Sequence, residues 1–550
     1  MHLVYGRREP LTFSIPRPKE REPLSSSTTN RIWTPLRSSL FRRILVASLV
    51  ADLGSFMQSV GAAWLMVSLH GGPLYVALTQ TASTLPFFLV GLPAGALGDI
   101  VDRRKMILLT ESWMLCVALV LAATTLAGAM SPWLLLALTF ALSLGQAMES
   151  PSWRALLPEL VARDDIASAA ALNGIEYNAA TAIGPALAGL LIATAGVGAA
   201  FVLYAVSFFA VIAVIGRWKR PIQQRRWPTE SLAGATVAAI RYVRYAPSIR
   251  AVLVRSTAVM FCASATFALL PTVASAVNSS PVVYGVLLGT FGIGAIGGAL
   301  TMQQARARWT PDSIVTAAVS VLGVATIAIG SLRELRGLLV AMLFSGGAWI
   351  VFFSIANAQI QTLSPDWIRA RLLAIFMLLT EGGLALGSVV WGMVASRMTV
   401  RTALISAGLA TVASTLLALI ARWPDEAADV TPWVHWRLPT VAVGTVTTPE
   451  QGPVLITVEY RVAPANVDDF LHAVAAYERI RRRDGAFRWS MFRDVERSDM
   501  YLETFLVSSW AEHLRQHERL TLGDRELEGR IAALVQGEPT IRHLVQPNLA

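Results

Sequence analysis

The chain has 550 residues, 54% of them apolar and only 15% charged, and its formal net charge is +10. Soluble domains carry about 25% charged residues, so this composition excludes a single soluble globule, a disordered chain and a disulfide-bonded secreted scaffold. The charge is unevenly placed, because 19 of the 36 acidic but only 15 of the 46 basic residues follow Ala421. A basic, apolar part is therefore joined to a mildly acidic tail. Without a basic groove or an aromatic–basic module, we expect no nucleic-acid partner.

The chain begins with a polar arm and continues with long apolar runs. Residues 1–39 are rich in Pro, Ser, Thr and Arg, which predicts a disordered cytoplasmic arm. The first apolar run lacks a small-residue cleavage site, so we expect an uncleaved membrane helix. Crossing the hydrocarbon core takes about 20 apolar residues in a helix. Twelve such runs are expected, at residues 44–69, 74–98, 106–129, 132–150, 168–195, 198–216, 251–275, 283–303, 312–330, 337–360, 372–397 and 402–421.

The basic residues between the runs predict the orientation. With the N-terminus in the cytoplasm, the five loops on that side hold 17 Lys and Arg residues, and the six loops on the other side hold four. Positive loops stay in the cytoplasm. Because the number of spans is even, both termini are expected in the cytoplasm.

The twelve runs fall into two groups of six. We expect an N-terminal six-helix bundle at residues 40–216 and a C-terminal six-helix bundle at residues 251–421, joined by a basic cytoplasmic linker at residues 217–250. Within the linker, RYVRYAPSIR (residues 241–250) is interpreted either as an amphipathic stretch on the anionic inner leaflet or as a solvated connection.

The most informative string is GLPAGALGDIVDRRKMI, at residues 91–107, where the second span ends. It fits the pattern G-x-L-x-D-x-x-x-R-R with Gly95, Leu97, Asp99, Arg103 and Arg104. The glycines allow close helix packing, and an acid at a membrane edge can pair with an arginine. We interpret the string as a charged latch that holds one conformation of a two-state protein. The alternative is a basic loop flank with an incidental acid.

A second string, NAATAIGPALAGLLIATAG, lies in the fifth span at residues 178–196. Pro185 removes a backbone hydrogen bond in mid-helix and kinks the helix. Gly184 and Gly189 are small enough for the helix to press on a helix of the other half, where the pair would close the outer gate. Ordinary small-residue packing is the alternative.

At these strings the chain resembles the major facilitator superfamily. Residues 91–107 are similar to its signature between the second and third helices, although Ile100 and Asp102 stand where the family usually has a basic residue and a glycine. A degenerate echo at residues 298–302 lacks the acid. Gly184-Pro185 with Gly189 resembles the exporter signature of this superfamily.

Three further strings narrow the resemblance to the transmembrane secretion effector branch. They are LGSFMQSVGAAWLMVSLHGGP (residues 53–73), QTASTLPFFLVGLPAGALGD (residues 80–99) and ESPSWRALLPELV (residues 149–161). The resemblance covers residues 40–422. It implies an all-α polytopic protein of the bacterial inner (plasma) membrane, with two six-helix bundles that rock about a central cavity. It also implies export of a small amphipathic molecule such as a siderophore, a drug or a secondary metabolite, rather than enzymatic activity.

Three acids lie at similar depth inside the spans: Asp52, Glu176 and Glu381. A charge at the centre of a membrane helix costs about 2.5–3.5 kcal/mol on insertion scales, so each acid is a functional candidate. A carboxyl group in a low-dielectric site can exchange a proton near neutral pH. We predict proton antiport with one of the three as the coupling acid, and a static ion pair is the alternative. Glu111 and Glu149 lie nearer the cytoplasmic ends of their helices.

The acidic tail is expected to be a linker, residues 422–452, followed by a cytoplasmic domain, residues 453–550. Its elements should be strands at 454–462, 486–495, 500–508 and 540–545, with helices at 467–483 and 510–535, the second broken near Gly523. The order βαββαβ is that of a ferredoxin-like α+β domain. It resembles the antibiotic-biosynthesis monooxygenase type of dimeric α/β barrel, which implies homodimerisation.

Histidines raise the question of whether the tail is an enzyme. His513 and His517 are four residues apart on one helix face, a spacing that can bind a metal. No third ligand is evident in the sequence, where His543 is no more than a candidate neighbour. The charged residues around them favour a solvated face. We therefore interpret the tail as a dimerisation or regulatory module without metal or cofactor. The alternative is a membrane-tethered oxidoreductase acting on a quinone-like substrate. No phosphate-binding loop occurs, which disfavours transport driven by ATP.

Overall fold

The computed structural model describes residues 33–100, 102–154, 156–218, 232–424, 429–431, 433 and 451–546. Most of the expected arm, and parts of both expected linkers, lie outside these residues. A short 3-10 turn, η1 (Thr34–Arg37), precedes the first long helix.

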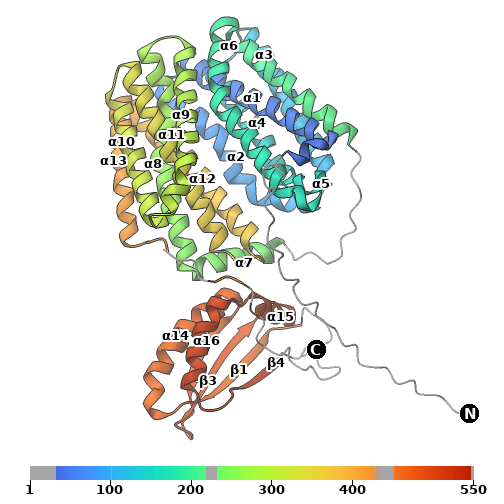
Figure 1. Ribbon diagram of the computed structural model, residues 1–550, viewed down its shortest axis with the longest axis vertical. Coiled ribbons are helices and arrows are strands. Elements are labelled where there is room, and N and C mark those ends of the chain that lie inside the picture. The colour runs from blue at the N-terminus through green and yellow to red at the C-terminus, as the bar shows by residue number, and fades with distance from the viewer. Residues whose placement is uncertain are drawn as a thin grey trace, which may run out of the picture.

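Long helices form two groups that lie side by side (Figure 1). The N-terminal half contains α1 (Ser39–Ser68), α2 (Gly72–Ile100), α3 (Arg103–Leu126), α4 (Pro132–Arg154), the short α5 (Leu157–Leu160), the turn η2 (Arg163–Asp165) and α6 (Ile166–Arg217). The C-terminal half contains α8 (Pro247–Val277), α9 (Pro281–Arg306), α10 (Pro311–Ser331), α11 (Leu335–Thr362), α12 (Arg369–Arg397), α13 (Val400–Ala413) and η3 (Ser414–Leu419). Four of these helices begin at proline, whose fixed φ and missing N–H suit the first helical position.

Eleven helices in the described part of the chain are long and apolar enough to cross a membrane. One of them, α6, has 52 residues and contains Gly196 at φ 84° and ψ 166°, a backbone conformation that glycine adopts readily. Gly196 divides α6 into two segments of spanning length, residues 166–195 and 197–217. The twelve predicted spans therefore correspond to these eleven helices, with the fifth and sixth joined without a loop.

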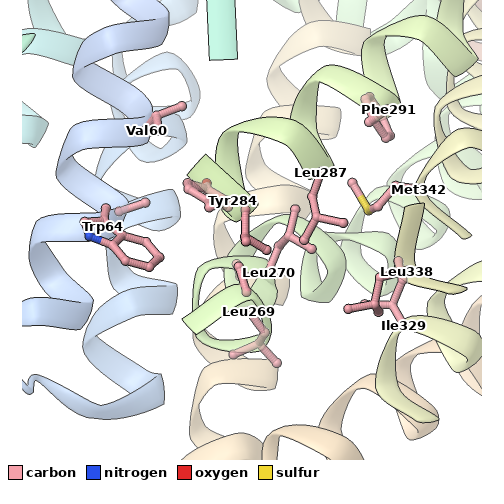
Figure 2. Close-up of a cluster of buried hydrophobic side chains, with 14 of the residues drawn as sticks. Val60, Trp64, Leu269, Leu270, Tyr284, Leu287, Phe291, Ile329, Leu338 and Met342 are labelled. Atoms are coloured by element: carbon pink, nitrogen blue, oxygen red, sulfur yellow. The ribbon is translucent and has the colours of Figure 1, made fainter. Parts of the chain in front are cut away.

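The two halves share a buried core at one end of the bundles. We call this end the His70 end, after the turn between α1 and α2. There, Val60 and Trp64 of α1 belong to the same buried cluster as Leu270 of α8 and Tyr284 of α9 (Figure 2). The cluster also contains residues of α10, α11 and α12, from the ends of these helices that lie at the His70 end. The halves are thus joined by apolar packing at the His70 end.

At the opposite end, which we call the α7 end, the described cores are separate. Phe41, Ile107 and Ile215 belong to a cluster of the N-terminal half alone. Ile249 and Phe376 belong to a cluster made only of α7 (Leu232–Tyr245), the C-terminal half and the segment that follows it. Each half is therefore packed on its own at the α7 end.

The C-terminal domain lies beyond α7 (Figure 1). Its elements are β1 (Val454–Arg461), η4 (Pro464–Asn466), α14 (Val467–Asp484), β2 (Phe487–Arg493), β3 (Met500–Val507), α15 (Trp510–Arg519), α16 (Leu522–Leu534) and β4 (Thr540–Val545). The sheet order is β2-β3-β1-β4, and each neighbouring pair is antiparallel. Alternate β1 residues are buried against α14, as a sheet with one covered face requires. The predicted βαββαβ order is confirmed.

The last helical segment is broken close to Gly523, as predicted. Leu520 and Thr521 adopt extended backbone angles between α15 and α16. Thr521 and Asp524 then form a capping box, in which each side chain accepts from the backbone N–H of the other residue. Gly523 is therefore inside the first turn of α16.

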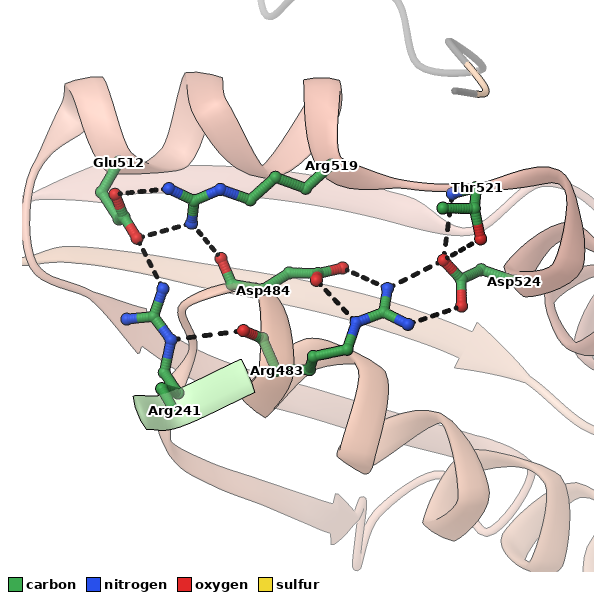
Figure 3. A network of polar contacts seen from close by, with 7 residues as sticks. All are labelled: Arg241, Arg483, Asp484, Glu512, Arg519, Thr521 and Asp524. Carbon is green, nitrogen blue, oxygen red and sulfur yellow. Dashed lines mark hydrogen bonds and ion pairs between the residues drawn. The ribbon is translucent and has the colours of Figure 1, made fainter. Parts of the chain in front are cut away.

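A network of charged residues connects the C-terminal domain to α7. We call it the docking network, and its members are Arg241, Arg483, Asp484, Glu512, Arg519, Thr521 and Asp524 (Figure 3). Arg241 Nη2 lies 2.9 Å from Glu512 Oε1, and its Nε donates to the carbonyl of Arg483 at 3.3 Å. Arg519 Nη1 donates to Glu512 Oε1 at 2.7 Å and to the carbonyl of Asp484 at 2.6 Å. Because α7 carries Arg241, part of the linker at residues 217–250 is a docking element.

Aromatic rings complete this contact. Arg519 lies 4.5 Å from the ring centroid of Trp367, in the loop between α11 and α12. Trp367 also meets Tyr242 of α7 edge to face, at 5.9 Å between centroids, and Arg483 lies over Tyr242 at 5.5 Å. A desolvated cation over an aromatic face is attracted by its quadrupole. The domain is thus held by α7 and by a loop of the C-terminal half.

Candidate functional site

A polar cavity of about 490 Å³ lies inside the N-terminal half. Its wall contains four acids from four different helices: Asp52 of α1, Glu111 of α3, Glu149 of α4 and Glu176 of α6. We call it the acid-lined cavity. Glu111 and Glu149 are buried, with 4% and 8% of their surface exposed. Such a concentration of acids among membrane helices is costly, so it points to a proton, a cation or a polar cargo group.

The four acids form two pairs. Asp52 and Glu176 lie close enough to affect each other's ionisation, and so do Glu111 and Glu149. Thr110 Oγ1 lies 3.4 Å from Glu149 Oε2. Two neighbouring carboxylates repel each other when both are charged, so each pair is a place where a proton can be held.

Glu381 reaches the same region from the C-terminal half. The charge of Arg154, at the end of α4 and in the wall of the acid-lined cavity, attracts Glu381. Tyr177, also in this wall, is affected by the charges of Asp52, Glu176 and Glu381 together. The structure therefore brings the three acids named from the sequence into one region. It adds Tyr177 and Arg154 to them, and Arg154 is identified from the sequence only as a basic loop residue.

The structure describes only part of the latch string, residues 91–107. The side chains of residues 92–100, among them Gly95, Leu97 and Asp99, lie outside the described residues. Arg103 Nη1 lies 2.6 Å from Glu159 Oε1 of α5. Arg104 donates to the carbonyls of Ile215 and Gly216, at 3.1 and 2.5 Å. These arginine contacts hold the α7 end of the N-terminal half together.

Asp102 has a role that the family pattern does not suggest. It is the N-cap of α3, and its Oδ1 accepts from the backbone N–H of Lys105 at 3.1 Å. An aspartate at this position satisfies a donor that the helix leaves open. The departure from glycine at this position therefore has a local structural reason.

The small residues of α6 face two different neighbours. A Cβ on Gly189 would lie 2.9 Å from the carbonyl oxygen of Pro281 and 3.1 Å from Cα of Gly285, both in α9 of the other half. A Cβ on Gly285 would lie 2.5 Å from the carbonyl oxygen of Pro185. Gly184 instead faces Phe56 of its own half, where a Cβ would lie 2.7 Å from the ring. Gly189 and Pro185 thus lie at the contact between the halves. Gly184 instead packs on Phe56, within the N-terminal half.

A second close contact joins the halves through α2 and α12. Thr81 Oγ1 donates to the carbonyl of Ala385 at 3.1 Å. A Cβ on Gly392 would lie 2.5 Å from Cβ of Ala77. Both helix pairs meet toward the His70 end, so backbone contacts reinforce the apolar core that closes this end.

His513, His517 and His543 of the C-terminal domain are not on a solvated face, and that expectation is wrong. His513 is 4% exposed, and Arg519 in the same helix is also 4% exposed. His513 Nε2 lies 3.2 Å from His517 Nε2, and the rings of His513 and His543 are 4.7 Å apart. Burial lowers the pKa of His513 to about 3 and that of His517 to about 4. Within the described residues, no group of three or more His, Cys, Asp and Glu residues is arranged to hold a metal ion.

Comparisons with known proteins agree with this architecture. A family model described as a transmembrane secretion effector matches residues 30–549. The enterobactin exporter EntS of Salmonella typhi is 27% identical over 372 residues, which are 65% of this chain and 86% of that protein. The multidrug efflux pump Tap of Mycolicibacterium fortuitum is 25% identical over 358 residues, 64% of this chain and 87% of Tap. The staphyloferrin A transporter of Staphylococcus aureus is 24% identical over 168 residues, 30% of this chain and 42% of that protein.

Solved structures show the same fold at low identity. The nucleoside transporter NupG, in a mutant form, superposes with a TM-score of 0.60 at 12% identity over 70% of this chain and 100% of NupG. A bacterial homologue of the human lysosomal transporter Spinster, inward-facing and unoccupied, gives a TM-score of 0.54 at 14% identity over 70% of this chain and 96% of its own. The transmembrane part thus has the fold of these transporters.

Proposed function

Since the chain belongs to the transmembrane secretion effector family, we propose that it is a secondary active exporter of a small amphipathic molecule. Its relatives are named for enterobactin, staphyloferrin A and multidrug efflux. Siderophores and drugs are therefore the cargo classes that this kinship favours. We assign no enzymatic step to the chain, and its partners are the cargo and the lipid bilayer. Homodimerisation through the C-terminal domain stays a prediction.

The proposal rests on one observation: the halves are joined at the His70 end and separate at the α7 end, and the N-terminal half contains an acid-lined cavity. Joined packing at one end and independent cores at the other are what one state of an alternating-access transporter requires. In the opposite state the contacts of Gly189 with α9 would separate and the α7 end would close. The arginines of the latch would then take part in that closure.

We place the α7 end in the cytoplasm, on the basis of the Lys and Arg count. The state described here is then open to the cytoplasm and closed to the outside. A cytoplasm-active reporter fused after Ala550 is expected to be active, and a periplasm-only reporter silent. The reverse result would overturn the orientation, the position of the C-terminal domain and the direction of transport.

Proton coupling is proposed for Asp52, Glu176 and Glu381. In the state open to the α7 end, the Asp52–Glu176 pair lines the cavity, where water can deliver or remove a proton. Rocking of the halves changes the distance of Glu381 from this pair and from Arg154, so the proton affinity of the site differs between states. An exporter that binds a proton outside and releases it inside can then drive cargo out.

The test is transport in proteoliposomes with an imposed pH gradient, using Asp52→Asn, Glu176→Gln and Glu381→Gln. The coupling variant is expected to lose uphill export at least tenfold while it retains downhill exchange, because cargo binding does not need the proton. Glu334→Gln, at the start of α11 and outside the cavity, is the matched control. Uphill export at the wild-type rate by all three variants would show that these acids are structural.

A further inference from the structure

An apolar groove lies on the surface of the C-terminal half, between α9 and α10. These two helices contact each other little and both pack on α11, so α11 forms the floor of the groove. We call it the α9–α10 groove. Its volume is about 770 Å³, within the roughly 300–1,000 Å³ of ligand pockets. Because it lies among helices of spanning length, its occupant reaches it through the bilayer.

The walls of the groove are made of small and apolar residues. Gly294 and Gly297 line it from α9, and Ala317 and Val321 line it from α10. A Cβ on Gly297 would meet nothing within 4 Å, so the space beside this residue is open. A gap between helices forfeits van der Waals contact. A hydrocarbon chain that fills the groove restores that contact.

The groove has the length of the acyl chains of one leaflet. Its residues on α10 run from Ser313, near the start of the helix at the α7 end, to Val321. Between these residues α10 rises about 12 Å, which is close to half of the roughly 30 Å hydrocarbon core. Val321 and Phe344 also line a second apolar groove, which continues toward the His70 end as far as Leu332. A chain that enters at the α7 end therefore stays between apolar walls.

An aromatic residue and two cations stand at the mouth of the groove at the α7 end. Trp309, in the loop between α9 and α10, lines the groove and is 62% exposed. Tryptophan gathers at the level of the lipid headgroups. Arg306 and Arg308 precede it and are exposed, and within the described part of the chain neither guanidinium makes a hydrogen bond or an ion pair. Asp312, the next acid along the chain, is already paired with the buried Arg255.

Arg306 corresponds to an arginine of the latch string in the other half. In the echo of that string, counted from its first glycine, Arg306 has the position of Arg103, and Met302 has the position of Asp99. Arg103 is paired with Glu159 of α5. Among the described residues, no acid pairs with Arg306 in this way. The second half thus keeps the cation of the latch without a counter-ion of its own, and an anionic headgroup can supply one.

We propose that the α9–α10 groove binds one anionic phospholipid of the leaflet at the α7 end. An acyl chain lies beside Gly297 in the groove, Trp309 lies at the level of the headgroup, and Arg306 and Arg308 bind the phosphate. A helix of a second copy would also fill the groove, but it would leave both arginines without a counter-charge. This inference goes beyond the proposed export function and does not depend on it.

The experiment is native mass spectrometry of the full chain in detergent, titrated with phosphatidylglycerol and, in parallel, with phosphatidylcholine that has the same chains. The first phosphatidylglycerol is expected to bind at least about fivefold more tightly, because phosphatidylcholine has no net charge. Arg306→Gln and Arg308→Gln should each weaken phosphatidylglycerol about fivefold and leave phosphatidylcholine unchanged, since each basic residue near the surface contributes about this factor. Arg244→Gln changes an exposed arginine of α7 and is the matched control.

Gly297→Leu tests the groove itself. Leucine is a good helix former, and the open space beside Gly297 accepts its side chain, so the variant should fold with the groove filled. It is expected to weaken both lipids about tenfold, because a chain would have to displace the new side chain. Gly174→Leu in α6, where a Cβ also meets nothing within 4 Å, should bind both lipids as the wild type does.

Four outcomes would overturn the proposal. Equal affinity of the wild type for the two lipids would exclude an anionic headgroup as the determinant. Arginine variants that behave like Arg244→Gln would exclude the mouth as the phosphate site, and this arm decides the question even if Gly297→Leu does not fold. Unchanged lipid binding by a folded Gly297→Leu would exclude the groove. A dimer that this variant abolishes would make a second copy the occupant.

Discussion

Two glycines set how closely α6 and α9 approach each other. Gly189 and Gly285 lie with their Cα atoms so close that a methyl group on either meets backbone of the other helix. Such contact needs residues without side chains and gives van der Waals packing over many atoms. The sequence singled out Gly189 from its string, but not Gly285, because the partner helix is known only once the halves are placed together.

Gly189→Ala tests this contact. The new methyl group meets the Pro281 carbonyl at 2.9 Å, and backbone cannot move aside as a side chain can. Overpacking of this kind costs about 1–3 kcal/mol, so closure at the His70 end is expected to weaken about tenfold and export to fall several-fold. The measurement is labelling of a cysteine placed near this contact, together with transport. Gly174→Ala in the same helix meets nothing within 4 Å and should behave as wild type.

At the scale of elements, apolar length and turn residues predicted the spans well. Each predicted span corresponds to a helix or to a segment of α6, because a run of about 20 apolar residues has few alternatives in a membrane. Glycine at residue 196 marked the boundary inside α6, although only the structure shows that no loop separates the two segments. The break predicted near Gly523 lies just before it, at Leu520 and Thr521, where the capping pair Thr521 and Asp524 starts α16. That pair was readable in the sequence.

The interiors of the elements were harder to predict than their order. His513 and Arg519 look like exposed helix residues, because local sequence does not show that α15 is covered on both sides. Their burial arises from the sheet, Trp367 and α7, which are distant in the sequence. The acid-lined cavity is a similar case, since single acids were visible but their pairing across α1, α3, α4 and α6 was not.

The buried histidines predict how the C-terminal domain responds to acid. His513 and His517 have folded pKa values near 3 and 4 against an ordinary value of 6.5. Between the folded and the ordinary pKa values, the unfolded chain binds more protons than the folded one. The contribution of these histidines to the free energy of unfolding is therefore fully present above about pH 6.5 and declines as the pH falls toward 4. Each histidine contributes a slope of up to about 1.4 kcal/mol per pH unit. Glu512, whose pKa its partners Arg519 and Arg241 lower against the effect of burial, loses its contribution only at lower pH.

This decline is measurable as the exchange rate of amides in β1 and β3 at pH 7.5, 6 and 5, corrected for the intrinsic pH dependence of exchange. His513→Gln is expected to flatten the dependence. His472→Gln, which changes an exposed histidine of α14, should leave it as in the wild type. A domain equally stable at pH 7.5 and 5 would contradict the neutral, buried state of the pair.

At the scale of the whole molecule, the docking network ties the C-terminal domain to one half. Arg241 and Tyr242 belong to α7, and Trp367 belongs to the loop that joins α11 to α12. The network is largely buried, so salt screens it less than it screens surface ion pairs. Nothing in the local sequence of the tail or of α7 reveals this contact. The charge difference between the basic linker and the acidic tail was its only visible sign.

Arg241→Ala is expected to loosen the domain, because it leaves Glu512 with fewer partners and removes the contact with the Arg483 carbonyl. Removing one partner of a buried pair costs about 3–5 kcal/mol when the other charge stays buried; here Arg519 still pairs with Glu512, so a smaller loss is expected. The measurement is the rate of proteolysis in the segment before Gln451. Arg244→Ala, an exposed arginine of the same helix, is the control. Equal cleavage of both variants and the wild type would show that Arg241 does not hold the domain.

The attachment of the domain to α7 and Trp367 also makes the two halves mechanically unequal. If the bundles rock, the C-terminal half carries about a hundred additional residues with it, while the N-terminal half, which holds the acid-lined cavity, moves without that load. If a neighbouring protein or a surface immobilises the domain, the C-terminal half stays fixed and the N-terminal half is the part that moves. In that arrangement the acid-lined cavity lies in the moving half, and the attachment of the C-terminal domain lies in the fixed half.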